Sequence, residues 1–318
     1  MPRILASADI GSNTVHLLVA EVENGHMSRI GDTNEWISLG EIVGRQEKIP
    51  AALADRLIRI LGDFKKIAIG QGAQAIYVFG TEAIRKATNQ AQVLEAIRVA
   101  TGIRVDIITG QREAELGLRG AWLDCAGEGP FVMCEVGGGS AQVAHCVEAE
   151  GLPFIEREES LPIGTGTLIA RLGLEAPCTE AQFQGLAHTV EDALRSVHAQ
   201  PNLLEVAEVG VHQSARRVIA CGGVARGLWR ALHPDGERVI DIEELDYLIW
   251  ATRQLTLDVI VDRFQVKPKR AATLLPGAVV YRTLLAQSGQ NKLVVSRFGV
   301  REGAILMMAE DKISPTKL

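Results

Sequence analysis

Long apolar runs are missing from this chain of 318 residues. None approaches the roughly 18–20 consecutive apolar residues that a membrane-spanning helix needs, which excludes a helical membrane protein. The first residues also lack the apolar stretch of a secretory signal, because the short patch there runs into Asp9. The sequence therefore predicts a cytoplasmic protein without a membrane partner.

Cysteine and basic charge are also scarce. The five cysteines form no CxxC pair and no zinc-type spacing with histidine, so they indicate free thiols in a reducing compartment. They are Cys125, Cys134, Cys146, Cys178 and Cys221. The 33 basic residues are outnumbered by 39 acidic ones, and the net charge of −6 argues against a nucleic-acid partner. An anionic ligand would need a local binding site rather than a basic surface.

What the chain has is an alternation of strand and helix patterns. Apolar residues at helical spacing predict helices over 51–68, 90–100, 111–123, 164–172, 179–198, 241–263, 269–287 and 300–312. Short apolar runs predict strands over 76–79, 104–108, 131–136 and 292–296. The chain is 47% hydrophobic and long enough for two domains. Together these features predict an α/β protein whose two domains share an interface with a cleft in it.

One motif occurs twice, at an offset of 126 residues. The first copy is ADIGSNTVHLLVAEV over 8–22, and the second is CEVGGGSAQVAHCVE over 134–148. Asp9 of the first copy aligns with Glu135 of the second. In each copy a strand pattern ends in a carboxylate, followed by a glycine turn with a hydroxyl residue and a second strand pattern.

A second pair of segments supports the duplication. The segments are IYVFGTEAIR over 76–85 and VIACGGVARG over 218–227, and they align Gly80 with Gly222 at an offset of 142. Each is an apolar strand pattern that ends in a glycine turn and enters a helix pattern. A repeat of such long period predicts two similar modules.

The three glycines behind Glu135 have two interpretations. Consecutive glycines are typical of a plain hairpin turn, but they also let a backbone approach a ligand closely. Successive amide groups in a tight turn form a nest that binds anions. Because the turn recurs with an acidic residue before it and a hydroxyl residue at its end, phosphate binding is an interpretation of both turns beside the plain hairpin.

Eight motifs, in order along nearly the whole chain, resemble the Ppx/GppA family of exopolyphosphatases and guanosine pentaphosphate phosphohydrolases. They are DIGSNTVHLLVAEV, GTEAIRKATN, TGQREAELGLRGA, EVGGGSAQV, SLPIGTGTL, CGGVARGL, LPGAVVY and VSRFGVREG. That family belongs to the superfamily of actin, the sugar kinases and the Hsp70 ATPase domain.

The resemblance implies two ribonuclease-H-like (actin-like ATPase) domains of the short, two-domain type, with a phosphate site in the cleft between them. We expect one domain over 1–124 with a C-terminal helix at about 303–318, and the other over 125–302. The family hydrolyses terminal phosphate from inorganic polyphosphate or guanosine pentaphosphate with Mg²⁺ or Mn²⁺. The resemblance thus implies a phosphoanhydride hydrolase that binds polyphosphate or guanosine penta- and tetraphosphate, and a homodimer.

The positions that match the family's motifs are the candidate site residues. The resemblance implies that Glu113 activates or positions the attacking water and that Arg85 clamps phosphoryl oxygens. Asp9 and Glu135 are assigned to the metal ion, which would relieve their repulsion of a polyanion. The predicted phosphate-binding residues are Gly11, Ser12, Asn13, Thr14, Gly137, Gly138, Gly139, Ser140, Gln142, Gly222 and Gly223.

Simpler interpretations of these residues stay open. Glu113 also suits the first turn of a helix, where a carboxylate satisfies free amides, and Arg85 suits a solvated helix face. Two groups of basic residues indicate either a track for a long polyanion or solvated surface. They are Lys267, Lys269 and Arg270, and separately Arg297 and Arg301.

Among the departures from the family's pattern, this chain has Glu135 where the family usually has Asp and Gln142 where it usually has Glu. An amide can neither take a proton nor offer a charge to a metal. The leading hypothesis is an exopolyphosphatase, and the alternative is a weakened member that binds polyphosphate or (p)ppGpp as a sensor. An actin-like kinase is a third hypothesis, which the match at Glu113 disfavours. A cysteine phosphatase is disfavoured because Cys221 and Arg226 are one residue too close for its active-site loop.

Overall fold

The structure is a computed structural model that describes residues 2–127, 129–198, 217–234 and 236–318. It divides into two units. The first comprises the chain up to Gly120 together with Phe298–Leu318, and the second comprises Ala121–Arg297. The boundaries expected from the sequence are at 124 and 303.

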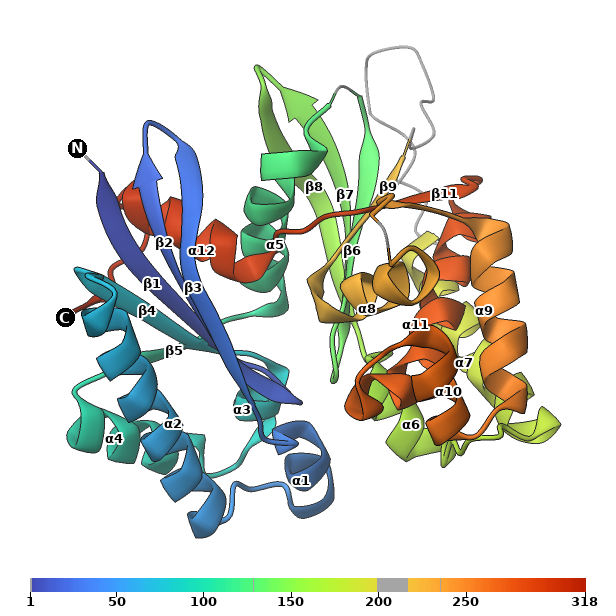
Figure 1. Ribbon diagram of the computed structural model, residues 1–318, viewed down its shortest axis with the longest axis horizontal. Helices are drawn as coiled ribbons and strands as arrows, with labels where there is room; N and C mark the ends of the chain where they lie inside the picture. Colours follow the sequence, from blue (N-terminus) through green and yellow to red (C-terminus); the bar gives the residue numbers. More distant parts are fainter. Residues whose placement is uncertain (1, 128, 199–216, 235) are drawn as a thin grey trace. The chain divides into compact units, whose positions relative to one another are not determined.

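The first unit contains a six-stranded sheet in which β1 is central (Figure 1). The strands are β1 (Arg3–Ile10), β2 (Thr14–Glu23), β3 (His26–Trp36), β4 (Ala75–Gly80), β5 (Val105–Ile107) and β12 (Thr316–Lys317). β1 pairs with β2 in antiparallel and with β4 in parallel orientation, and β5 extends the sheet in parallel beyond β4. This order, β3-β2-β1-β4-β5, is that of a ribonuclease-H-like sheet.

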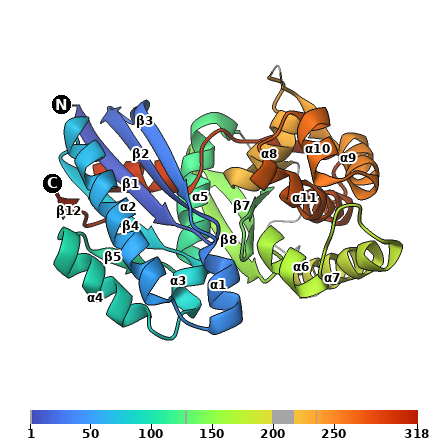
Figure 2. The same ribbon diagram turned by 60° about the horizontal axis from the view of Figure 1, so that its bottom comes forward.

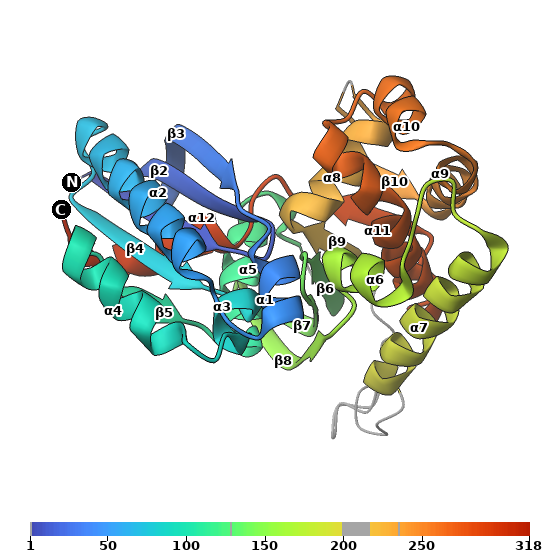
Figure 3. The same cartoon turned by 90° about the horizontal axis from the view of Figure 1, so that it is seen from below.

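Helices cover both faces of this sheet. They are α1 (Leu39–Gln46), α2 (Ala51–Gly70), α3 (Glu82–Lys86), α4 (Gln90–Thr101), the first part of α5 (Gly110–Cys125) and α12 (Val300–Ala309). Figures 2 and 3 show α2 and α4 on one face and α12 on the other. Side chains alternate along a strand, so Ala6, Ala8 and Ile10 of β1 pack toward α2. Asp9, between them, points to the face of α12.

The second unit repeats this arrangement. Its strands are β6 (Phe131–Val136), β7 (Ala141–Ala149), β8 (Leu152–Leu161), β9 (Val218–Cys221), β10 (Val239–Asp241) and β11 (Lys292–Val295). β6 is antiparallel to β7 and parallel to β9, and β11 is parallel to β9. The order β8-β7-β6-β9-β11 therefore matches that of the first unit, with β10 added at the edge.

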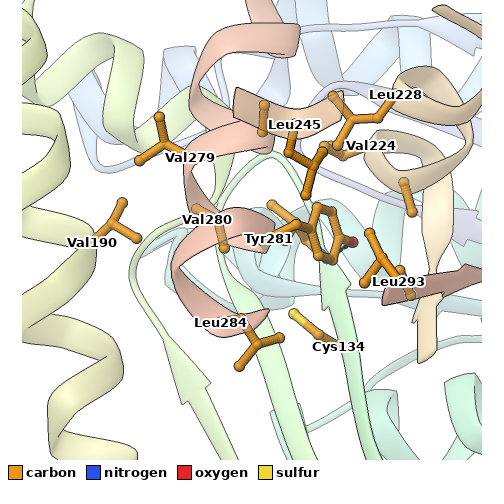
Figure 4. Packing of buried hydrophobic residues seen from close by; sticks show 14 of the residues in the cluster. Cys134, Val190, Val224, Leu228, Leu245, Val279, Val280, Tyr281, Leu284 and Leu293 are labelled. Carbon is orange, nitrogen blue, oxygen red and sulfur yellow. Dashed lines mark hydrogen bonds between the residues drawn. The ribbon is translucent and has the colours of Figure 1, made fainter. Parts of the chain in front are cut away.

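Helix α11 (Pro268–Gln287) is the centre of the second unit's core. It packs against the other helices of this unit, which are α6 (Thr165–Leu172), α7 (Glu180–His198), α8 (Gly222–Leu232), α9 (Ile242–Gln254) and α10 (Leu257–Phe264). Figure 4 shows the buried Tyr281 ring of α11 among apolar side chains. Its hydroxyl accepts a hydrogen bond from the Val136 amide at 3.2 Å and donates to the Cys221 carbonyl. The ends of β6 and β9, where the candidate site begins, are thus tied to the core.

Strand register confirms both repeats. Asp9 pairs with His16 across β1 and β2 as Glu135 pairs with Gln142 across β6 and β7, which preserves the offset of 126. Phe79 lies beside Asp9 just as Cys221 lies beside Glu135, which preserves the offset of 142. The two aligned segments of sequence are therefore equivalent in three dimensions.

The α/β class and most of the predicted elements are confirmed, but the single helix predicted over 241–263 is wrong. Leu255 and Thr256 have extended dihedrals, with ψ of 148° and 160°, so α9 ends before them and α10 begins after them. Threonine is a favoured residue at a helix N-cap. The carbonyl of Arg253 accepts the Cys178 amide at 2.8 Å, which satisfies a group at the break. The last helix also ends earlier than predicted, at Ala309.

In the described part of the chain, none of the helices combines the length and the apolarity that crossing a membrane requires.

Candidate functional site

In the first unit, hydrogen bonds from the protein's own amides close the turn between β1 and β2. The Gly11 amide donates to the Thr14 carbonyl at 2.9 Å. The Ser12 carbonyl accepts the Gly40 amide at 2.7 Å, and the Asn13 carbonyl accepts two amides of the segment that precedes α1. The carbonyl groups in the middle of this turn are therefore directed at the protein.

The turn between β6 and β7 in the second unit has the same construction. The Gly137 amide donates to the Ser140 carbonyl at 2.8 Å. Thr167 of α6 donates its amide to the Gly138 carbonyl at 3.0 Å and its hydroxyl to the Gly139 carbonyl at 2.8 Å. Here too the carbonyl groups are occupied by the protein.

Unlike these carbonyls, the amides in the middle of both turns make no hydrogen bond to the described part of the protein. Within residues 2–127, 129–198, 217–234 and 236–318, no acceptor is found for the amides of Ser12, Asn13, Gly138 and Gly139. A tight turn whose carbonyls face inward and whose amides lack protein partners is suited to an anion. Each turn is therefore a hairpin, as in the simpler interpretation, and also has the amide pattern of an anion-binding nest.

Behind the first unit's turn, Asp9 forms an ion pair. Nη1 of Arg301 in α12 donates to Oδ1 of Asp9 at 2.6 Å. The two side chains are only 15% and 13% exposed, respectively. The sequence placed Asp9 in a metal site and Arg301 on a basic surface, whereas the structure brings them together.

Behind the second unit's turn, Glu135 lies against Gly222 at the start of α8. A Cβ on Gly222 would stand 2.6 Å from Oε1 of Glu135, and Gly222 has a φ of +85°. Both facts require glycine at this position. The Cys221 thiol donates to Oε2 of Glu135 at 3.3 Å, and burial together with this carboxylate raises the pKa of Cys221 well above its usual value.

Four of the five cysteines are buried, and this leads to a prediction for thiol reactivity. Burial raises the pKa of Cys125 and of Cys146 to about 12, and that of Cys134 and Cys221 as well. Because the thiolate is the reactive form, we expect a disulfide reagent at pH 8 to modify only the partly exposed Cys178 rapidly. The same reagent should modify all five thiols in urea. Rapid modification of a second thiol in the native protein would contradict this packing.

Of the two residues assigned to a metal ion, Glu135 suits that role and Asp9 does not. Mg²⁺ commonly binds through one or two carboxylates plus substrate phosphates. Glu135, beside the second turn, fits such a role. Asp9 does not, because its Oδ1 is bonded to Arg301. Among the described residues there is no cluster of three or more His, Cys, Asp or Glu side chains that could hold a metal ion.

Gln142 lies below the second turn rather than at its surface. Its side chain is buried, with the residue 1% exposed, and its amide nitrogen donates to the Ser140 hydroxyl at 2.8 Å and the Ser160 hydroxyl at 3.2 Å. It therefore orients Ser140 in the turn.

The substitution Gln142→Glu is expected to destabilise the protein in a pH-dependent way. Burial raises the pKa of a carboxyl group above its unfolded value of about 4.3. Below pH ~4 both states are protonated and the change costs little. As the pH rises, the carboxyl group ionises first in the unfolded state. Near pH 8 the loss in the free energy of unfolding should reach about 2–3 kcal/mol, which corresponds to a pKa about two units higher in the folded state. Urea unfolding at both pH values measures it, and an equal loss at both would refute a buried carboxyl here.

Arg85 and Glu113 lie near the start of α5. The Arg85 guanidinium donates to the carbonyl of Ile108 at 2.5 Å, one residue before Thr109. The Thr109 hydroxyl accepts the Arg112 amide at 3.1 Å, and the Thr109 carbonyl accepts the Glu113 amide at 3.0 Å. Glu113 is thus in the first helical turn, partly buried. The structure brings the predicted arginine and glutamate to one end of one helix.

Arg270 is a site residue whose individual position sequence reasoning did not identify. Its guanidinium lies against Gly223, where a Cβ would stand 2.9 Å from Nη2. Burial, with Arg226 and Arg230 nearby, lowers the pKa of Arg270. The sequence grouped it with Lys267 and Lys269, which remain exposed. Burial and the contact with Gly223 distinguish Arg270 from the two lysines.

The other predicted basic pair is not a single feature. Arg297 belongs to the second unit, where its Nε lies 3.4 Å from the buried Asp124 carboxylate. Arg301 belongs to the first unit and pairs with Asp9.

Two ribonuclease-H-like sheets, each with an amide-bearing turn after its first strand, define the chain as a protein of the actin-like fold. The chain matches the Ppx/GppA phosphatase family over residues 18–312 and belongs to that family. Family members are phosphoanhydride hydrolases and generally depend on a metal.

Named relatives match along nearly the full chain. Exopolyphosphatase 1 of Mycobacterium leprae is 26% identical over 321 residues, which cover 99% of this chain and 92% of that protein. Exopolyphosphatase 1 of Mycobacterium tuberculosis is 28% identical over 325 residues, covering 99% and 90%.

Solved structures show the same fold. The Ppx/GppA family member of Aquifex aeolicus has a TM-score of 0.82 at 23% identity, covering 99% of this chain and 100% of that one. An exopolyphosphatase from Cytophaga hutchinsonii has a TM-score of 0.85 at 20% identity, covering 97% and 98%.

Proposed function

We propose that this protein is an exopolyphosphatase that releases the terminal phosphate of inorganic polyphosphate by attack of water. One observation carries the proposal: in each unit a turn has its carbonyls bonded inward and two amides for which the described residues offer no acceptor. A polyphosphate chain offers anionic oxygens along its whole length, which such amides bind. The names of the mycobacterial relatives support the same substrate.

In this proposal the residues near α5 perform the chemistry. Phosphoryl transfer requires mainly positioning and charge stabilisation. Glu113 orients the attacking water and accepts its proton, and Arg85 neutralises charge on the transferred phosphoryl group. The hydrogen bond from Arg85 to Ile108 fixes the guanidinium relative to the helix that carries Glu113.

The second unit binds phosphate in this proposal. The Gly138 and Gly139 amides hold phosphate oxygens, and Gln142 keeps the Ser140 hydroxyl in place for the same ligand. Gly222 and Gly223 begin α8, whose N-terminus favours an anion, and Arg270 adds a guanidinium there. Glu135 would hold a Mg²⁺ or Mn²⁺ ion, which would supply positive charge for the phosphate oxygens.

We further propose guanosine pentaphosphate as a second substrate, a cytoplasmic location and a homodimer. The second substrate and the homodimer follow from the resemblance of the motifs to the family. The location follows from the scattered cysteines, which indicate a reducing compartment.

The test is phosphate release from long-chain polyphosphate by the purified protein with Mg²⁺, and separately with Mn²⁺. Guanosine pentaphosphate and ATP are compared at equal phosphate concentration. We expect steady release from polyphosphate, shortening of the chain from its end, and little release from ATP. Absence of release from every substrate would overturn the proposal.

A second candidate function is a binding protein without efficient turnover. Buried Gln142 favours it, because the family usually has an acidic residue there and an amide cannot replace its charge. This function predicts tight polyphosphate binding without phosphate release, and a gain of release in Gln142→Glu.

A further inference from the structure

The ion pair between Asp9 and Arg301 is nearly buried. It lies on the face of the first unit's sheet that α12 covers, and it joins residues that are 292 positions apart. With side-chain exposures of 13% for Asp9 and 15% for Arg301, little water screens the attraction between them. Removing one partner would leave the other charge buried and uncompensated.

Other contacts fix the end of α12 that carries Arg301. The Gly299 amide donates to the Glu302 carboxylate at 2.9 Å, and Arg29 donates to the same group at 2.6 Å. Glu302 is 3% exposed. On the next residue, Gly303, a Cβ would lie 1.9 Å from a backbone oxygen of α5. These contacts fix the N-terminal end of α12, and they therefore hold Arg301 in position beside Asp9.

A cation at Asp9 would have to stand beside this guanidinium. The Asp9 carboxylate also lies against the turn, because a Cβ on Gly11 would be 3.6 Å from Oδ2. A divalent ion there would be repelled by Arg301 in a place with little screening. The Arg301 guanidinium already neutralises the Asp9 carboxylate, so no cation is needed to relieve its repulsion of a polyanion.

We infer that Arg301 takes the place of a metal ion at Asp9. Arg301 is a positioning residue: it holds the Asp9 carboxylate and neutralises its charge, so that Asp9 does not repel a polyanion at this turn. Asp9 is then not a metal ligand in this chain. The inference deepens the proposed function and rests on it, because it names the group that neutralises Asp9 beside the first unit's phosphate-binding turn.

The test measures Mn²⁺ binding to the full-length protein, without substrate, by electron paramagnetic resonance. Because no turnover is involved, its result is independent of the phosphatase assay. Asp9→Asn should leave the Mn²⁺ affinity of the protein unchanged. Arg301→Gln should create a site at Asp9 and raise the affinity by about tenfold or more. Adding Asp9→Asn to Arg301→Gln should abolish that gain.

Two controls separate this effect from general damage to α12. Arg301→Lys keeps the positive charge and should bind Mn²⁺ as the wild type does. Arg119→Gln breaks a different ion pair to the same end region of the chain, with Glu310, and should also leave Mn²⁺ binding unchanged. Weaker binding in Asp9→Asn alone, or no gain in a folded Arg301→Gln protein, would overturn the inference.

Discussion

Replacing Glu113 by glutamine is expected to lower the rate of phosphate release from polyphosphate by ~10²–10⁴-fold. The glutamine keeps the size of the side chain but cannot accept a proton. Polyphosphate affinity should stay within a few-fold of the wild type, because the amides that bind phosphate lie in other segments. Initial rates of phosphate release and a separate binding titration measure the two quantities.

The matched control for this variant is Glu115→Gln on the same helix. Glu115 pairs with Arg112 at the surface, and its side chain is 46% exposed. We expect its rate to remain near that of the wild type, since surface ion pairs contribute little. Equal loss of activity in both variants would mean that Glu113 acts only through the stability of α5.

The substitution Gly303→Ala is expected to destabilise the protein by about 3 kcal/mol. The added Cβ would stand 1.9 Å from the Leu116 carbonyl oxygen, which belongs to the backbone of α5 and cannot turn away. Relief requires a shift of α12, which would also displace Arg301 from Asp9. Urea unfolding followed by circular dichroism measures the loss.

Gly62→Ala is the control for this prediction. Gly62 lies inside α2 of the same unit, and its nearest neighbour would be a methyl carbon of Thr101 at 4.0 Å. Alanine is the better helix former by about 0.5–1 kcal/mol, so this variant should be slightly more stable than the wild type. If Gly303→Ala were as stable as Gly62→Ala, the close crossing of α5 and α12 would be wrong.

The duplicated turn could be predicted from the sequence because each copy is defined by residues that are close together in the chain. Asp9 and Gly11 are separated by one residue, as are Glu135 and Gly137, and each group lies at the end of an apolar strand. Such spacing determines which groups emerge at the end of a strand. The amide pattern of the turns was therefore predictable, and their equivalence followed from a constant offset.

Contacts between distant segments could not be predicted in this way. Arg301 was assigned to a basic surface because nothing near it in sequence indicates Asp9 as its partner. In the sequence Arg270 is one of three neighbouring basic residues, and its burial and its tertiary contact with Gly223 separate it from the other two. The interruption between α9 and α10 depends partly on an amide of Cys178, far away along the chain. Each of these features is decided by tertiary packing rather than by local pattern.

The central claim is that the two turns bind phosphate through their amides. We would test it by nuclear magnetic resonance of the isotope-labelled Glu113→Gln protein, titrated with tripolyphosphate. The account predicts that the amide signals of Ser12, Asn13, Gly138 and Gly139 shift together along one binding curve. Tripolyphosphate binding that leaves these four signals unmoved would contradict it.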